Sequence, residues 1–199
     1  LLKSVEPKIR HAVTAMQQSP NSSFAESFRA LDTAISQATH GRNQVIAITS
    51  ALPDEGKTVI SCCLSYVLAQ SGKKTILIDC DLRRAGISRL LDMREYDHGL
   101  IEYLDGKTEI NFDNLSDERI FCVLPLRPSD ELPDHLLTGD AFIRLLDELR
   151  TRFDHIILDL PPVLPIASTP VLAARADATV MTTRWRKTSR FALRAALKR

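Results

Sequence analysis

The sequence lacks the cysteine spacings that mark a metal or redox site. Its four cysteines are Cys62, Cys63, Cys80 and Cys122. None belongs to a C-x-x-C pair or to a zinc-ligand spacing, which argues against a zinc module and a thioredoxin-like motif. We therefore expect these residues to be buried, reduced thiols in a reducing compartment.

Long apolar runs are also missing. No run approaches the roughly 18 residues of a membrane span, and no signal peptide opens the chain, so we expect a soluble, cytoplasmic polypeptide. The first residue is Leu1 rather than Met, which is compatible with a piece of a larger protein. The formal net charge is only +1 and gives no electrostatic argument for a nucleic-acid partner; we expect none. At 199 residues and 44% hydrophobic content, the chain can bury one sizeable core.

A phosphate-binding motif lies near the start of this core. The β-branched run Val45–Thr49 predicts a buried strand, and residues 58–71 predict a core-packed helix. The loop between them, Ala51 to Thr58, has Walker A spacing with alanine at the first glycine position. Backbone N–H groups in such a loop converge on phosphates, while Lys57 would reach the β- and γ-phosphates and Thr58 would ligate Mg²⁺. The predicted nucleotide-binding residues are Asp54, Glu55, Gly56, Lys57, Thr58 and Val59. The alternative is a plain strand–turn–helix with a surface lysine. That alternative does not require the motif to lie between a predicted strand and a predicted helix, as it does here.

Carboxylates follow two further predicted strands. Asp79 ends the apolar run that begins at Thr75, Asp81 follows two residues later, and Asp159 closes a Walker B-like strand. Ligands of open parallel sheets bind at the carboxyl ends of the strands, so we expect all three aspartates near the phosphates and Mg²⁺. We place Asp81 beyond its strand end, nearest the solvent. The alternative for Asp79 and Asp81 is a turn with acidic caps.

The regular alternation of strands and helices predicts the fold class: α/β, with a doubly wound, mainly parallel sheet flanked by helices, as in P-loop NTPases. We interpret residues 1–21 as a linker or N-terminal arm and residues 22–199 as the P-loop domain. A helix is predicted over 22–39, with an apolar stripe of Phe24, Phe28, Leu31 and Ile35. Glu26 and Arg29 lie on another face; the simplest interpretation is a solvated pair.

Three motifs together resemble the bacterial tyrosine kinases, the cytoplasmic ATP-binding domains of exopolysaccharide chain-length regulators (polysaccharide co-polymerases). They are Pro53-Asp-Glu-Gly-Lys-Thr58, Ile76-Leu-Ile-Asp-Cys-Asp-Leu-Arg-Arg84 and Ile156-Ile-Leu-Asp-Leu-Pro-Pro162. Weaker echoes are Glu26-Ser-Phe-Arg29 and Arg184-Trp-Arg-Lys-Thr188. The resemblance runs from about residue 22 to the end, and the second motif, with its two aspartates, separates this group from generic P-loop NTPases.

The resemblance implies an ATP-dependent, autophosphorylating protein-tyrosine kinase domain that regulates exopolysaccharide synthesis and export. It implies ATP or ADP with Mg²⁺, the metal being held through Thr58, Asp79 and Asp159. The implied catalytic residues are Lys57, Asp79, Asp81 and Asp159, with Asp81 as the candidate that deprotonates the attacking tyrosine. It further implies a ring-like homo-oligomer whose neighbours present tyrosine tails, a transmembrane activator segment or protein, and a place at the cytoplasmic face of the inner membrane.

Several positions depart from the family pattern: Asp32, Asp54, Ala85 and Ser168 stand where Arg, Gly, Pro and Asp are usual. Asp32 removes the second arginine of a Glu-x-x-Arg-x-x-Arg interface signature, so we expect weaker ring assembly. No tyrosine cluster ends the sequence; either the chain continues beyond Arg199 or the substrate tyrosines lie elsewhere. The alternative function is a nucleotide-gated assembly module that hydrolyses ATP slowly without phosphorylating tyrosine. Partition and division-site ATPases are disfavoured, because they carry an extra lysine where Leu52 stands.

Overall fold

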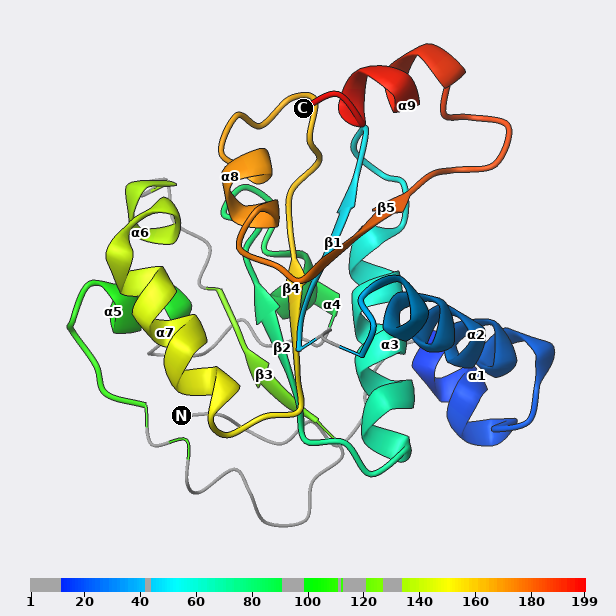
Figure 1. The fold of residues 1–199 in the computed structure, drawn as a ribbon, viewed down its shortest axis with the longest axis horizontal. Coiled ribbons are helices and arrows are strands. Elements are labelled where there is room, and N and C mark those ends of the chain that lie inside the picture. Colours follow the sequence, from blue (N-terminus) through cyan, green and yellow to red (C-terminus); the bar gives the residue numbers. More distant parts are fainter. Residues whose placement is uncertain (1–11, 42–43, 91–98, 111, 113–120, 127–133) are drawn as a thin grey trace.

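The computed structural model describes residues 12–41, 44–90, 99–110, 112, 121–126 and 134–199. Its centre is a parallel five-stranded sheet in the order β3-β2-β4-β1-β5 (Figure 1). The strands are β1 (Val45–Ser50), β2 (Thr75–Asp79), β3 (Cys122–Leu124), β4 (His155–Asp159) and β5 (Ala178–Thr182). A parallel sheet needs crossover connections, and these put helices on its faces.

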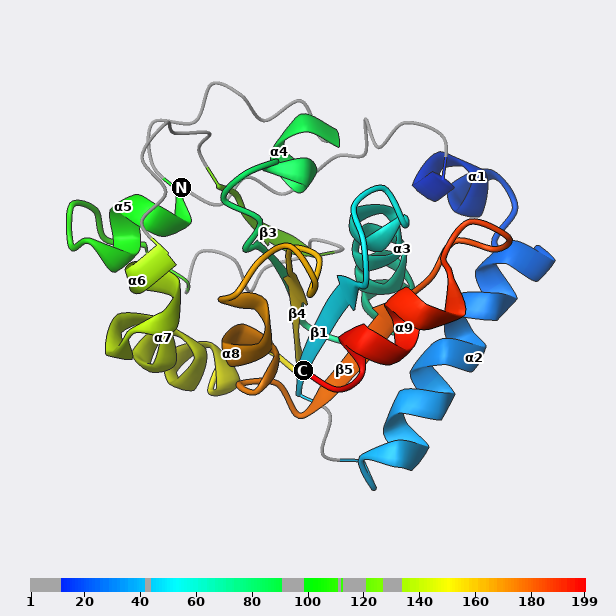
Figure 2. The same cartoon turned by 90° about the horizontal axis from the view of Figure 1, so that it is seen from above.

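Helices cover both faces of the sheet (Figures 1 and 2). On one face lie α1 (Ala12–Gln18), α2 (Ser23–Ala38), α3 (Lys57–Gln70) and α4 (Gly86–Leu90). On the other lie α5 (Leu100–Leu104), α6 (Asp134–Thr138), α7 (Asp140–Arg150) and α8 (Thr169–Ala173). A last helix, α9 (Arg190–Ala196), sits beyond the carboxyl ends of β1 and β5. The predicted doubly wound α/β fold is therefore confirmed.

The central strands supply both halves of the core by side-chain alternation. In β1, Ile46 and Ile48 pack towards α3, whereas Val45 and Ala47 pack towards α7. All four are fully buried. A strand buried on both faces needs an apolar residue at every position, which is why the motif-bearing strand is a continuous apolar run. This core fixes the strand ends that carry the aspartates.

The helix that follows the phosphate loop is buried on most of its surface. Cys62, Cys63, Leu64 and Leu68 in α3 are all at most 1% exposed. All four cysteines of the chain are buried, as the sequence predicts, and none of them forms a disulfide with a residue that the structure describes. A helix surrounded in this way holds its N-terminus, and therefore the phosphate loop, in a fixed position against the sheet.

The N-terminal helices pack against the free side of α3. The Ser22 hydroxyl caps α2 by accepting a hydrogen bond from the Ala25 amide (3.3 Å), and Phe28 and Ile35 are buried. Phe24 was expected in the same stripe but is 42% exposed, although its ring makes a T-shaped contact with the Phe28 ring. Met16 of α1 is 1% exposed, so this part of residues 1–21 is a packed arm. Of the described helices, none is long and apolar enough to cross a membrane.

A single carboxylate ties the start of β1 to α7 and to the turn before β5. Asp177 accepts hydrogen bonds from the Val45 amide (2.7 Å) and from Arg150 Nη1 and Nη2 (3.1 and 3.0 Å). Partial burial raises the pKa of Asp177, but the Arg150 and Val45 donors outweigh it, so the net pKa lies below its ordinary value. The folded state therefore favours the ionised form.

Replacing Asp177 by Ala is expected to lower the free energy of unfolding by about 1–3 kcal/mol at neutral pH, since a buried amide and a guanidinium lose their acceptor. Because the folded-state pKa is depressed, this stabilisation is present above the unfolded pKa of about 4 and is lost as the pH falls through the folded value. Urea unfolding of both proteins across this range measures the effect. Asp147→Ala, at an exposed position of α7, is the matched control; an equal loss there would contradict the assignment.

Candidate nucleotide-binding and catalytic site

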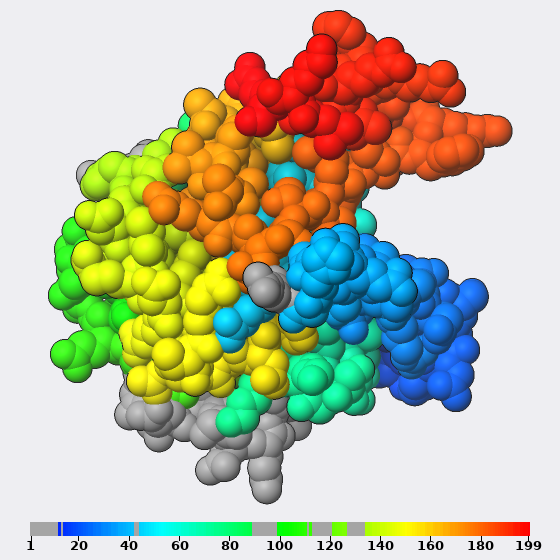
Figure 3. Space-filling model, viewed as in Figure 1, coloured from blue at the N-terminus to red at the C-terminus, as the bar shows by residue number. Residues whose placement is uncertain are grey.

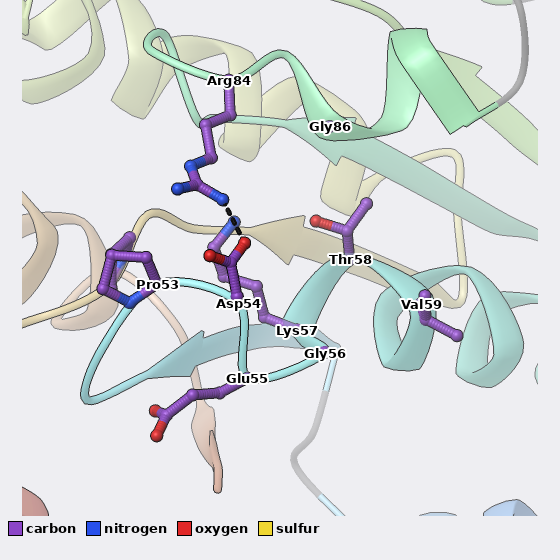
Figure 4. A pocket seen from close by; sticks show the side chains of 10 residues that line it. Pro53, Asp54, Glu55, Gly56, Lys57, Thr58, Val59, Arg84 and Gly86 are labelled. Atoms are coloured by element: carbon purple, nitrogen blue, oxygen red, sulfur yellow. Dashed lines mark hydrogen bonds and ion pairs between the residues drawn. The ribbon is translucent and has the colours of Figure 1, made fainter. Parts of the chain in front are cut away.

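The carboxyl ends of β1, β2 and β4 meet at a pocket of about 520 Å³ (Figure 4). Its lining residues are Pro53, Asp54, Glu55, Gly56, Lys57, Thr58, Val59, Arg84, Gly86 and Pro162. This set contains all six predicted nucleotide-binding residues. A phosphate loop at the N-terminus of a buried helix offers N–H groups and a favourable dipole for anions.

The backbone of the phosphate loop takes two left-handed conformations. Gly56 has φ +87° at the N-cap of α3, and Asp54 has φ +63°. Left-handed backbone favours glycine, and aspartate is among the few other residues that adopt it readily. The aspartate that replaces the usual glycine at 54 is therefore compatible with the loop conformation.

Lys57, which lines this pocket, forms a buried ion pair with Asp81. Lys57 Nζ lies 2.8 Å from Asp81 Oδ2, and the two side chains are 8% and 1% exposed. The expectation that Asp81 lies nearest the solvent is wrong. The chain turns back after β2, with the Arg84 and Ala85 amides donating to the Asp81 carbonyl (3.1 and 2.8 Å), and this turn points the carboxylate at Lys57.

Asp79 is held by backbone amides. Its Oδ1 accepts from the Asp81 amide (3.2 Å), and its Oδ2 accepts from the amides of Ile87 and Ser88 (3.1 and 3.4 Å) at the start of α4. Burial and the neighbouring Asp159 nevertheless raise the pKa of Asp79 well above its ordinary value. With both oxygens engaged, Asp79 anchors the turn that carries Asp81 and Gly86.

Asp159 lies beside Asp79 in the register of β4 and β2. Its Oδ1 accepts from the Ser61 hydroxyl (3.1 Å), while Oδ2 is buried without a hydrogen-bond partner among the described residues. Burial raises the pKa of Asp159, although Lys57 and the hydroxyls of Thr58 and Ser61 lower it in part. A buried carboxylate oxygen without a donor calls for a cation.

The donor set fits Mg²⁺. Three carboxylates, those of Asp79, Asp81 and Asp159, and one ammonium, that of Lys57, are buried at this edge of the sheet. Their formal charges leave an excess of negative charge that a divalent cation would offset. Oxygen ligands suit Mg²⁺, which retains several of its waters and needs few protein ligands. The Thr58 hydroxyl and Asp159 Oδ2 are the available oxygens.

Comparisons with known proteins agree with this geometry. Residues 43–196 match a protein-family model described as "AAA domain". The solved kinase domain of the Escherichia coli tyrosine kinase ETK superposes with a TM-score of 0.83 and 30% identity, over 98% of this chain and 76% of that domain. The chain belongs to the bacterial tyrosine kinase family. The similarity extends over the phosphate loop, both aspartate-bearing strands and the helices around them.

The relatives of this tyrosine-kinase domain are longer proteins. The succinoglycan biosynthesis transport protein ExoP of Rhizobium meliloti is 34% identical over 174 residues, which cover 85% of this chain and 22% of ExoP. The septum site-determining protein MinD of Pyrococcus horikoshii, solved with Mg-ADP, shares the fold with a TM-score of 0.56 and 21% identity, over 70% of this chain and 57% of that one. The chain thus spans less than a quarter of the curated relative's length.

Gly86 leaves room for the side chain of Thr58, the predicted metal ligand. A Cβ atom at residue 86 would lie 2.8 Å from Thr58 Oγ1 and 3.2 Å from Thr58 Cγ2. Figure 4 shows Thr58 pointing towards the segment that carries Gly86. This contact was not predicted from the sequence, because Gly86 and Thr58 come from different crossovers and meet only in the folded sheet.

Replacing Gly86 by Ala is expected to turn the Thr58 hydroxyl away from its present position and to weaken Mg²⁺-dependent nucleotide binding about tenfold. This is the lower end of the range for losing a residue that orients a metal ligand. Titration calorimetry with Mg²⁺ and with a chelator measures the effect, which should appear only with the metal. The double variant Gly86→Ala/Thr58→Ser removes the Thr58 methyl, which frees the hydroxyl to rotate away from the new Cβ, and should recover part of the affinity. An equal loss with and without Mg²⁺ would contradict this role.

Two further contacts of the loop were missed by the sequence analysis. Arg84 forms an ion pair with Asp54 across the pocket (Figure 4). Glu55, although it lines the pocket, is 8% exposed and accepts hydrogen bonds from the Leu52 amide (2.9 Å) and from the Thr188 hydroxyl. The second contact joins the phosphate loop to the segment after β5, and the only sequence signal for it was the motif that ends in Thr188.

Proposed function

We propose that the chain is an ATP-dependent, autophosphorylating protein-tyrosine kinase domain that regulates exopolysaccharide synthesis and export. The observation that carries the proposal is the buried Lys57–Asp81 pair beside the Walker A loop. Lys57 lines the phosphate pocket, and its partner is a carboxylate that generic P-loop NTPases do not require. The names of two relatives, "tyrosine-protein kinase" and "succinoglycan biosynthesis transport protein", support the same activity and process.

In this proposal the loop from Asp54 to Val59 binds the phosphates of ATP through its amides, and Lys57 neutralises the β- and γ-phosphates. Thr58 and Asp159 would hold the metal, and Asp79 would act mainly by fixing the turn between Asp81 and Gly86. Bound Mg²⁺ would supply charge neutralisation on the transferring group.

Asp81 is the proposed proton acceptor. As ATP binds, Lys57 turns its ammonium towards the phosphates and releases the Asp81 carboxylate. A tyrosine hydroxyl gives its proton to Asp81, its oxygen forms the bond to the γ-phosphorus, and the bond to the leaving ADP breaks. The ion pair would thus keep the Asp81 carboxylate occupied until the nucleotide arrives.

We infer that the tyrosine comes from the tail of a neighbouring copy in a ring-like homo-oligomer, with a transmembrane activator segment or protein holding the ring at the cytoplasmic face of the inner membrane. On α2, the Glu26–Arg29 pair (2.7 Å) is exposed and available to a neighbour. Arg29 Nη2 also donates to the Pro20 carbonyl (2.6 Å), which fixes the guanidinium. Asp32 would weaken this interface.

The same Lys57–Asp81 pair also favours the second candidate, a nucleotide-gated assembly module. If Lys57 never releases Asp81, ATP binds and is slowly hydrolysed without transfer to tyrosine. The two candidates are separated by incubating the chain with Mg²⁺-ATP and a tyrosine-rich peptide, then measuring phosphotyrosine and released phosphate. Phosphotyrosine on the peptide is the expected result; phosphate release alone would leave the assembly module.

A further inference from the structure

The segment after β5 carries charge of one sign only. Residues 184–199 contain five arginines and two lysines and no acidic residue. The cations are Arg184, Arg186, Lys187, Arg190, Arg194, Lys198 and Arg199, and all are exposed. None forms an ion pair with any residue that the structure describes. In a chain of net charge +1, this is a strong local concentration of positive charge.

Large apolar side chains are exposed in the same segment. Trp185 is 85% exposed, Phe191 is 83% exposed and Leu197 is 66% exposed. Single exposed apolar residues are ordinary on protein surfaces, but three within one short segment mark an interaction site. They are the three most exposed large hydrophobic side chains of the described residues.

Cationic and large apolar side chains lie side by side on the outward face of α9. Ala192 and Ala196 are buried, and Ala196 packs with Ala51 and Val163. At 100° per residue, the outward face of α9 then carries Arg190, Phe191 and Arg194, and Leu197 and Lys198 follow directly after the helix and are also exposed. The helix is therefore amphipathic in an unusual sense: small residues face the protein, and cations mixed with large apolar residues face outward.

This surface is preformed and stands out from the domain. In Figures 1 and 3 the segment from β5 to α9, orange to red, projects from the rest of the molecule. Thr188 Oγ1 accepts from the Arg184 amide (2.8 Å) and donates to Glu55, and Ser189 caps α9 by accepting from the Ala192 amide (3.1 Å). These bonds hold the backbone between Arg184 and Ala192, so binding would not need to order it.

We propose that residues 184–199 dock the domain onto an anionic phospholipid bilayer. The cations match negatively charged headgroups, and Trp185 and Phe191 suit the boundary between headgroups and acyl chains. A protein partner would need hollows to receive these protruding rings, whereas a bilayer needs none. A nucleic acid would use the cations and aromatic rings, but Leu197 offers it no base-stacking plane. A lipid surface can bind the cations, the aromatic rings and Leu197 together.

The expected affinity is modest. Each cation near an anionic membrane surface raises the affinity roughly fivefold, and salt screens this attraction. Partial insertion of three apolar side chains adds to it, but reversible attachment of this kind is stable only with a second anchor. The surface would therefore orient a domain that is already held near the membrane, with its phosphate loop close to the bilayer side.

The test uses phosphatidylcholine vesicles, with and without one quarter phosphatidylglycerol. Trp185 is the only tryptophan of the chain, so its emission reports this surface directly. A blue shift and co-sedimentation are expected with the anionic vesicles and not with the neutral ones, and both should decrease as salt is added. Binding to neither kind, equal binding to both, or an unchanged emission maximum would overturn the proposal.

Two double variants with the same change in net charge test whether binding depends on the charge of residues 184–199 or on the net charge of the whole chain. Arg190→Glu/Arg194→Glu is expected to weaken binding to the anionic vesicles at least about twenty-fivefold. Lys73→Glu/Lys74→Glu makes the same change in net charge at the exposed turn between α3 and β2, at the other end of the sheet, and should leave binding nearly unchanged. Equal losses in the two variants would overturn the proposal, as would a Trp185→Ala/Phe191→Ala variant that binds like the parent. Neither reversal touches the nucleotide pocket, so unchanged nucleotide binding confirms that both variants fold.

Discussion

Replacing Lys57 by Met is expected to weaken ATP·Mg²⁺ binding by at least about a hundredfold, equivalent to about 3 kcal/mol. Lys57 is the one buried cation among the charged residues of the described core, and it faces a pocket shaped for phosphates. A charge-assisted contact to phosphate in a partly desolvated site is among the stronger hydrogen bonds. Titration calorimetry with the parent and the variant measures the loss; unchanged affinity would refute the assignment of the nucleotide site.

The same substitution carries a stability cost that must be separated from binding. It leaves the Asp81 carboxylate buried without its partner, which typically destabilises a protein by about 3–5 kcal/mol. The double variant Lys57→Met/Asp81→Asn removes both charges and should recover most of the free energy of unfolding, measured in urea, while nucleotide binding stays weak. If the double variant regained nucleotide binding, the phosphate-binding role of Lys57 would be wrong.

Replacing Asp81 by Asn is expected to lower phosphate transfer to tyrosine by about 10²–10⁴-fold, the usual contribution of a positioned general base. The amide is nearly isosteric and still offers an oxygen to Lys57, so nucleotide affinity should change little. The assay is transfer to a tyrosine-rich peptide supplied in trans, beside nucleotide affinity by calorimetry. Transfer at the parent rate would show that Asp81 is not the proton acceptor.

Asp159 and Asp79 provide the comparison for Asp81. Asp159→Asn is expected to weaken nucleotide binding only when Mg²⁺ is present, because Oδ2 is the carboxylate oxygen left without a donor. Asp79→Asn should produce a similar but indirect loss, since an amide in place of one oxygen cannot accept from all three backbone donors that fix the turn before α4. If Asp81→Asn showed the same Mg²⁺-dependent loss, Asp81 would support metal binding, directly or through the turn, and a role as proton acceptor alone would be wrong.

The parts of the site that follow from local patterns could be predicted from the sequence. The strand, loop and helix around Lys57 are contiguous, and their spacing reflects contacts within one segment. The pairing of Asp79 with Asp159 follows from a general property of parallel sheets, whose carboxyl ends share one edge. These predictions needed no knowledge of how distant segments pack.

The parts that depend on packing between distant segments could not be predicted. Asp81 appeared to extend towards solvent because alternation says nothing about a turn after the strand; the observed turn buries it against Lys57. The closeness of Gly86 to Thr58 is likewise set by how two separate crossovers meet on the sheet. Phe24 was placed in the apolar stripe by its spacing, but α2 presents only part of that stripe to α3.

Glu55 gives the domain a physical means of allosteric communication. One of its carboxylate oxygens accepts a hydrogen bond from the Leu52 amide in the phosphate loop. The other accepts one from the hydroxyl of Thr188, which belongs to the proposed lipid-binding segment, residues 184–199. If the phosphate loop changes conformation when nucleotide binds, the Glu55 contacts would therefore change the conformational free energy of residues 184–199, and with it their affinity for lipid. Thermodynamic reciprocity then requires that anionic vesicles change nucleotide affinity by the same factor by which nucleotide changes vesicle affinity. In Thr188→Val, which keeps the shape but not the hydroxyl, we expect both factors to approach unity together.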